Sequence, residues 1–152
     1  MPTRDDSETH FINVDLDIYS KSDLEPLVAA LGERVYVLYV GRLRRTYEAH
    51  LELAFSAARS HNADAYIRRF ATLIAALPKA QRELWDTAKS REFSIAVHAQ
   101  MQPFSWETVL SAETVAAAAR LKARIGFTVY VPEAPRTVAK KKRASARRQK
   151  AL

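Results

Sequence analysis

Acidic and histidine side chains recur where the sequence alternates apolar and polar residues. The polar positions are Asp15 and Asp17 in one such segment, Glu48, His50 and Glu52 in a second, and His98 in a third. Because alternate residues of a strand point to opposite faces, all six would lie on the polar side of one sheet. Carboxylates and imidazoles gathered there could bind a divalent cation or carry out acid–base chemistry. Alternation alone also produces such a set, so solvated outward positions are the simpler interpretation.

Several other reaction centres are excluded because the residue types they need are missing. The chain has three glycines, Gly32, Gly41 and Gly126, whereas phosphate-binding loops need several close together so that backbone amides can approach phosphate. It has no cysteine, which excludes disulfides, a thiolate nucleophile and Cys-ligated zinc. No serine has the flanking glycines of a nucleophile elbow, and the four histidines are too scattered for a one-helix metal motif. We therefore expect no enzymatic activity, no cofactor and no metal site.

Residues 35–40 are apolar on both faces of the expected strand. β-branched and aromatic residues in succession predict a strand that is covered on both sides or lies in a subunit interface. For the second case we expect a homodimer with Tyr36, Leu38 and Val40 in the interface. The larger aromatic side chains could instead form an interface or a stacking platform for bases, but their spacing places most of them in the core; these are Trp85, Trp106, Tyr36, Tyr39 and Tyr47.

The end of the sequence carries its positive charge. Eight basic residues and no acidic one lie between positions 136 and 150: Arg136, Lys140, Lys141, Lys142, Arg143, Arg147, Arg148 and Lys150. The chain has 24 basic and 17 acidic residues, so the remainder has 16 against 17 and a formal charge of −1. A flexible basic segment can follow a phosphate backbone without reading its sequence, which predicts contact with nucleic acid or an acidic protein. A tail that only improves solubility is the alternative.

The elements that must position these residues follow from hydrophobic periodicity and from cap and turn signals. Gly41 marks a hairpin, Ser105 or Ser111 caps the last helix, and Gly126 ends it. The expected elements are strand 10–19, helix 24–31, strand 35–40, strand 46–55, helix 62–77, helix 79–89, strand 93–99, a helix ending at Gly126, and strand 127–131. The order β-α-β-β-α-α-β-α-β predicts an α+β fold, with a mainly antiparallel sheet, helices on one face, and a ferredoxin-like core extended by a helix and a strand.

Composition divides the chain into three parts. We expect a disordered N-terminus at 1–9, a single α+β domain at 10–132 and a flexible basic tail at 133–152. The N-terminus is acidic where a secretory signal would be basic and apolar, and no apolar run approaches the ~20 residues that cross a bilayer. The expected location is the cytoplasm, without membrane contact.

The apolar spacing of residues 10–131 resembles that of the bacterial domain-of-unknown-function family numbered 4279. The resemblance rests mainly on residues 93–98, the serine-capped segment Leu110-Ser111-Ala112-Glu113-Thr114, and the closing aromatic strand within 121–130. The chain lacks the glycine-rich turn expected after the first helix, where only Gly32 stands. Some similar proteins look like immunity proteins, which implies protein binding rather than catalysis. The basic tail lies outside the resemblance.

Two functions are consistent with these observations. The first is a non-enzymatic bacterial interaction module whose basic tail contacts nucleic acid or another polyanion. The second is an immunity-type protein that occludes a toxin with its folded face. An enzyme that uses Asp15, Asp17, His50 and His98 is a third, which requires these side chains to converge in a pocket.

Overall fold

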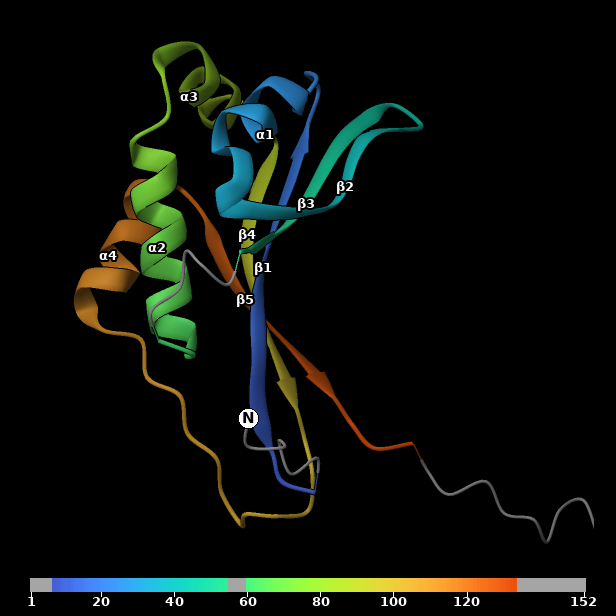
Figure 1. Cartoon of the computed structure of the whole chain (residues 1–152), viewed down its shortest axis with the longest axis vertical. Coiled ribbons are helices and arrows are strands. Elements are labelled where there is room, and N and C mark those ends of the chain that lie inside the picture. The colour runs from blue at the N-terminus through green and yellow to red at the C-terminus, as the bar shows by residue number, and fades with distance from the viewer. Residues whose placement is uncertain (1–6, 55–59, 134–152) are drawn as a thin grey trace, which may run out of the picture.

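A computed structural model describes residues 7–54 and 60–133, and there the protein is α+β with a five-stranded mixed sheet (Figure 1). The elements follow the expected order: β1 (His10–Ser20), α1 (Glu25–Leu31), the 3-10 turn η1 (Gly32–Arg34), β2 (Val35–Leu43), β3 (Thr46–Leu53), α2 (Ala63–Ala75), α3 (Lys79–Asp86), β4 (Ser90–His98), α4 (Ala112–Arg120) and β5 (Arg124–Tyr130). The sequence prediction of fold class and element order is confirmed.

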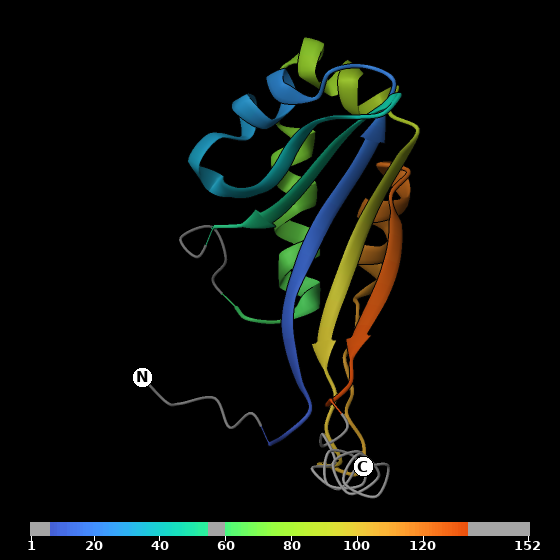
Figure 2. The same cartoon turned by 90° about the vertical axis from the view of Figure 1, so that its right-hand side faces the viewer.

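The strands lie in the order β2-β3-β1-β4-β5. β1 pairs antiparallel with both β3 and β4, and β2 pairs antiparallel with β3. These four strands, with the helices between them, form the expected ferredoxin-like core. α4 connects β4 to β5, and β5 pairs parallel with β4. Parallel neighbours need a crossover connection of this kind, because the chain must return to the starting end of the sheet. The helices cover one face, and Figure 2 shows α2 and α4 behind the strands.

The core lies between that face and the helices. Val14, Leu16 and Ile18 of β1 are fully buried, and they alternate with half-exposed polar residues. β3 and β4 add their own alternating apolar residues, and the inner side of α2 supplies Phe70 and Ile74. Full burial of each such side chain stabilises the fold by about 1.5–3 kcal/mol. The apolar residues that recur every second position in the strands thus pack against those that recur every 3.6 positions in the helices, and together they form one core.

Trp85 joins three elements at one end of this core. Its side chain is fully buried, and its Nε1 donates a hydrogen bond of 3.1 Å to the carbonyl oxygen of Leu121, just after α4. Arg91 of β4 in turn donates to the carbonyl oxygen of Trp85 at 2.7 Å. The expected core position is confirmed for Trp85, and Trp106 and Tyr47 are partly buried against the core. Tyr36 and Tyr39 are exposed instead.

The interpretations of Gly41 as a hairpin turn and of Gly126 as the end of a helix are wrong. The hairpin between β2 and β3 turns at residues 44–45, where Arg44 has a φ of 58°, and Gly41 lies inside β2. Likewise α4 ends at Arg120, and Gly126 lies inside β5. Both glycines are sites of close approach: a Cβ at Gly41 would lie 2.9 Å from the Tyr39 Oη, and one at Gly126 would lie 2.8 Å from the Glu92 Oε1. Turns and close contacts both favour glycine, so the sequence signal was ambiguous.

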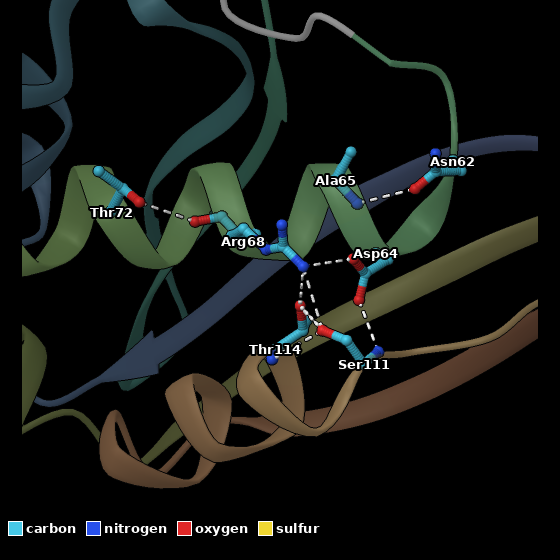
Figure 3. A network of polar contacts seen from close by, with 7 residues as sticks. All are labelled: Asn62, Asp64, Ala65, Arg68, Thr72, Ser111 and Thr114. Carbon is cyan, nitrogen blue, oxygen red and sulfur yellow. Dashed lines mark hydrogen bonds and ion pairs between the residues drawn. The ribbon is translucent and has the colours of Figure 1, made fainter.

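A polar latch of Asp64, Arg68, Ser111 and Thr114 joins the first turns of α2 and α4 (Figure 3). Ser111, not Ser105, is the N-cap of α4, and its Oγ accepts a hydrogen bond from the Thr114 backbone N–H at 3.2 Å. The Asp64 Oδ1 accepts from the Ser111 N–H at 2.8 Å, while Arg68 donates to the other carboxylate oxygen at 2.9 Å. Burial opposes ionisation of Asp64, but the hydrogen bonds from Ser111 and Thr114 and the Arg68 charge outweigh it and lower the pKa.

Asp64→Ala removes the acceptor of this latch and leaves the Ser111 N–H without its partner. We expect the free energy of unfolding to fall by about 1–2 kcal/mol at pH 7. Since the pKa of Asp64 is lowered by folding, its contribution is present above the ordinary Asp pKa and is lost as the pH falls through the folded value. Urea unfolding at neutral and acid pH measures both effects. Asp86→Ala is the control, because Asp86 pairs with Arg82 on the surface of α3 and should cost under about 0.5 kcal/mol. Equal losses in the two variants would contradict a special role for the latch.

Candidate functional site

The second face of the sheet carries no helix, and we call it the uncovered face. Cross-strand pairing aligns its side chains in rows, because Asp15 lies opposite Glu52 and Ser94, while Asp17 lies opposite His50 and Glu92. The face is made up of Asn13, Asp15, Asp17, Tyr19, Tyr36, Tyr39, Glu48, His50, Glu52, Glu92, Ser94, Ala96, His98, Thr128 and Tyr130. The six acidic and histidine residues picked out in the sequence therefore share one face, as alternation predicted.

His50 and two carboxylates form the first group on this face. Its Nδ1 lies 2.6 Å from the Asp17 Oδ1, and its Nε2 lies 3.2 Å from the Glu48 Oε2. Tyr19 packs edge-on against the imidazole, with 5.7 Å between ring centroids. Burial disfavours the charged imidazole, but the hydrogen bonds and charges of Asp17 and Glu48 outweigh it and raise the pKa of His50. The two carboxylates thereby favour the protonated, positively charged form of the ring.

Asp15 and Glu52 form a second group beside the first. The Asn13 Nδ2 donates a hydrogen bond to the Glu52 Oε1 at 2.8 Å, and Glu52 lies beside the Asp15 carboxyl across the paired strands. Burial, followed by the charges of Glu52 and Asp17, raises the pKa of Asp15 to about 6. The Asp15 Oδ1 is out of contact with solvent and accepts no hydrogen bond within the described residues.

A depression of about 420 Å³ lies next to this carboxyl pair. It is lined by Ile12, Asn13, Asp15, Glu52, Ala96, His98 and Tyr130. A smaller one of about 260 Å³ adjoins it along Asn13 and Glu52 and reaches His61 and Tyr66. The register of β1 against β4 shifts between Phe11 and Asn13, which marks a β-bulge. Ile12 and Asn13, at this bulge, line both depressions.

The convergence that an enzyme would require is partial. Asp17 and His50 are in direct contact, whereas His98 lies across the depression, hydrogen-bonded to Gln100 and stacked against His10. No group of three histidine or acidic side chains within residues 7–54 and 60–133 is arranged to hold a metal ion. What this arrangement offers is a concentration of carboxylates on one face, where His50 contacts Asp17 and Glu48 and Arg124 pairs with Glu92.

The edge strand β2 presents the exposed apolar surface nearest to this face. Tyr36 is 49% and Leu38 is 54% exposed, while Val40 is partly buried against the core. The prediction of a strand covered on both sides is wrong, since Tyr36 to Tyr39 are all exposed and β2 is the first strand of the described sheet. Such an edge offers unpaired main-chain groups to another chain. The alternative, that residues 35–40 lie in an interface, stays a prediction.

Sequence reasoning missed two contributors to the site. Asn13 alternates with Asp15 and was visible as an outward residue, but nothing marked its contact with Glu52. Tyr130 belongs to the appended strand β5, which reaches the depression only because β5 pairs with β4 in register with His98. The eight basic residues of the tail, which the sequence also marked as candidate functional residues, lie outside the described residues.

Comparison of the chain with protein-family models, with curated proteins and with solved structures finds no match. The resemblance to the family numbered 4279 therefore stays a prediction. Among the helices of the part that the structure describes, none has the length and apolar character needed to cross a membrane.

Asp15→Asn tests the electrostatics of the site. Because folding raises the pKa of Asp15 from 3.8 to about 6, the folded protein binds more protons than the unfolded chain between these values, and stability falls as the pH rises through them. We expect D15N to be more stable than the wild type by about 1 kcal/mol at pH 7, allowing for solvent screening of a half-exposed carboxyl, and little different below about pH 4.

Urea unfolding as a function of pH measures this difference. Asp23→Asn is the matched control, because it removes one carboxylate from the surface while an asparagine oxygen can still accept from the Glu25 N–H. A D15N effect that is the same at every pH would show that ionisation of Asp15 is not the cause.

Proposed function

We propose that the protein is an interaction module that binds a basic partner protein with its uncovered face and the adjoining edge of β2. The observation that carries the proposal is the group of five carboxylates on that face: Asp15, Asp17, Glu48, Glu52 and Glu92. Only the bound imidazole of His50 and the guanidinium of Arg124, which pairs with Glu92 at 2.9 Å, offset them within the described residues. The face is thus strongly acidic on a body whose formal charge is close to zero.

This distribution suits protein recognition for two physical reasons. A one-sign surface steers an oppositely charged partner and suppresses wrong ones. Tyrosines supply the contact area that charged rims lack, and Tyr19, Tyr36 and Tyr39 lie among the carboxylates. The apolar edge of β2 then adds main-chain pairing to the contact. A toxin with a basic surface is one such partner, which would make the protein the immunity-type module suggested by the resemblance. The edge of β2 offers a separate contact, through Tyr36, Leu38 and Val40, for the homodimer expected from the sequence.

The test compares matched baits. Immobilised full-length protein captures partners from a lysate of the source organism, mass spectrometry identifies them, and calorimetry measures affinity for the purified partner. The face variant, D17N/E48Q/E92Q, should weaken binding at least about tenfold and reduce its salt dependence. The control, E83Q/D86N/E113Q, removes the same charge from exposed positions of α3 and α4 and should leave affinity unchanged. A partner that binds the face variant as tightly as the wild type would contradict the proposal.

A second function is favoured by the tail, whose eight basic residues include no acidic neighbour. We propose that it contacts nucleic acid or another polyanion, independently of the uncovered face. Since the remainder of the chain has a formal charge of −1, attraction to a polyanion must come mainly from this segment.

For duplex DNA, the logarithm of the binding constant should fall with the logarithm of the salt concentration with a slope of up to about −7 if all eight charges engage. Changing the eight basic residues to glutamine in the full-length chain should abolish the slope. Fluorescence anisotropy at two salt concentrations measures it for DNA and RNA. Binding that survives these substitutions, or that ignores salt, would remove the electrostatic mechanism.

A further inference from the structure

We propose that the depression beside the Asp15–Glu52 pair is a binding site for a guanidinium or ammonium group. The inference deepens the proposed function and rests on it for the biological ligand, since an arginine or lysine side chain of a basic segment carries that group. The site itself follows from the geometry and charge of five residues: Asn13, Asp15, Glu52, His98 and Tyr130.

Hydrogen-bonding capacity is the first argument. The Asp15 Oδ1 is out of contact with solvent and has no hydrogen-bond partner in the described part of the chain, which is a costly state for a carboxylate oxygen. Asn13 satisfies Glu52 from one side only. A planar guanidinium presents several N–H donors in a fixed fork, and an ammonium presents three, so either can donate to both carboxyls at once.

Charge is the second argument. His50 is the cation whose field favours the ionised form of Asp15, and it is already bonded to Asp17 and Glu48. Asp15 and Glu52 therefore lie side by side without a cation of their own. A bound cation favours the ionised form of Asp15 and donates charge-assisted hydrogen bonds to the two carboxyls.

Shape is the third argument. A volume of about 420 Å³ lies within the range of ~300–1,000 Å³ typical of small-ligand pockets. Ala96 and Ile12 line part of it without competing polar groups, and Tyr130 offers an aromatic ring to an organic cation. The site thus selects a cation with an organic body, in agreement with the finding that no metal-binding group of three ligands exists among residues 7–54 and 60–133.

Proton competition makes binding depend on pH. The titratable groups facing Asp15 are Asp17 on its own strand, Glu52 and His50 on β3, His98 on β4 and Tyr130 on β5. Because the pKa of Asp15 is about 6, protonation removes the anionic partner in most molecules at pH 5. Affinity should therefore fall about tenfold between pH 7.5 and pH 5.

The experiment uses ¹⁵N-labelled full-length protein titrated with methylguanidinium chloride at constant ionic strength. We expect saturable shifts in the backbone amides of Asn13, Asp15, Glu52 and Ala96, together with the tenfold pH effect. D15N and E52Q should each abolish the saturable shifts. Glu83→Gln is the matched control, since it removes an exposed carboxylate of α3 that lies outside the depression and outside the uncovered face, and it should leave them unchanged. Shifts that are unsaturable, scattered over the acidic face or equal in D15N would overturn the proposal.

A second part of the experiment distinguishes two sources of the cationic group, the chain's own tail and a partner protein. If the chain's own tail occupies the depression, the full-length variant with its eight basic residues changed to glutamine should bind methylguanidinium more tightly than the wild type does. Equal affinity assigns the site to a partner's side chain. A basic partner that binds D15N/E52Q normally but loses affinity for D17N/E48Q/E92Q would overturn the site while leaving the proposed function intact.

Discussion

The central position of β1 determines both the core and the candidate site. Over residues 15–19, β1 pairs with β3 on one side and with β4 on the other, and its side chains point alternately to the two faces of the sheet. On one face Val14, Leu16 and Ile18 meet the helices and are fully buried. On the other face, the same strand brings Asp15 and Asp17 between the carboxylates of β3 and β4. A shift of the register by one residue would bury the carboxylates and expose the core, so the apolar set fixes the site as well.

The carboxylates of the uncovered face lower the stability of the fold, whereas the contacts on the helix side raise it. Burial, followed by the charges of the neighbouring carboxylates Glu52 and Asp17, raises the pKa of Asp15 to about 6, and Asp17 and Glu48 raise the pKa of His50 against the effect of its burial. A group of carboxylates that lowers the stability of the folded state is a common sign of function, because binding surfaces are shaped for a partner and not for the folded state alone. The helix side shows the opposite design. The carboxylate of Asp64 is satisfied by the Ser111 N–H and by Arg68, and its pKa is lowered.

The latch also connects the two halves of the fold. It fixes the first turn of α4 against α2, and α4 in turn delivers β5 to the outer side of β4. Tyr130 of β5 lines the depression on the uncovered face. The contact between Asp64 and Ser111 in the helix layer therefore helps to position a side chain on the opposite face of the sheet. The sheet nevertheless keeps two edges, β2 and β5, and both expose large apolar residues, among them Tyr36, Leu38 and Phe127. An acidic face bordered by apolar edges is the surface through which we propose that the protein meets its partner.

The sequence by itself determined the α+β class, the order of the elements and the side of each strand on which the acidic residues lie. These features depend on periodicity between neighbouring residues, which the chain carries locally. The sequence could not locate the hairpin turn at Arg44 or the end of α4, because Gly41 and Gly126 were interpreted as turn residues. In the structure these glycines make room for the side chains of Tyr39 and Glu92. The folded structure was needed to show that β2 is an edge strand, that His50 contacts Asp17, and that His98 instead lines one depression with Asp15 and Tyr130. The reason is physical: strand order and register are set by hydrogen bonds and packing between residues far apart in sequence, and local patterns carry no record of which strands become neighbours.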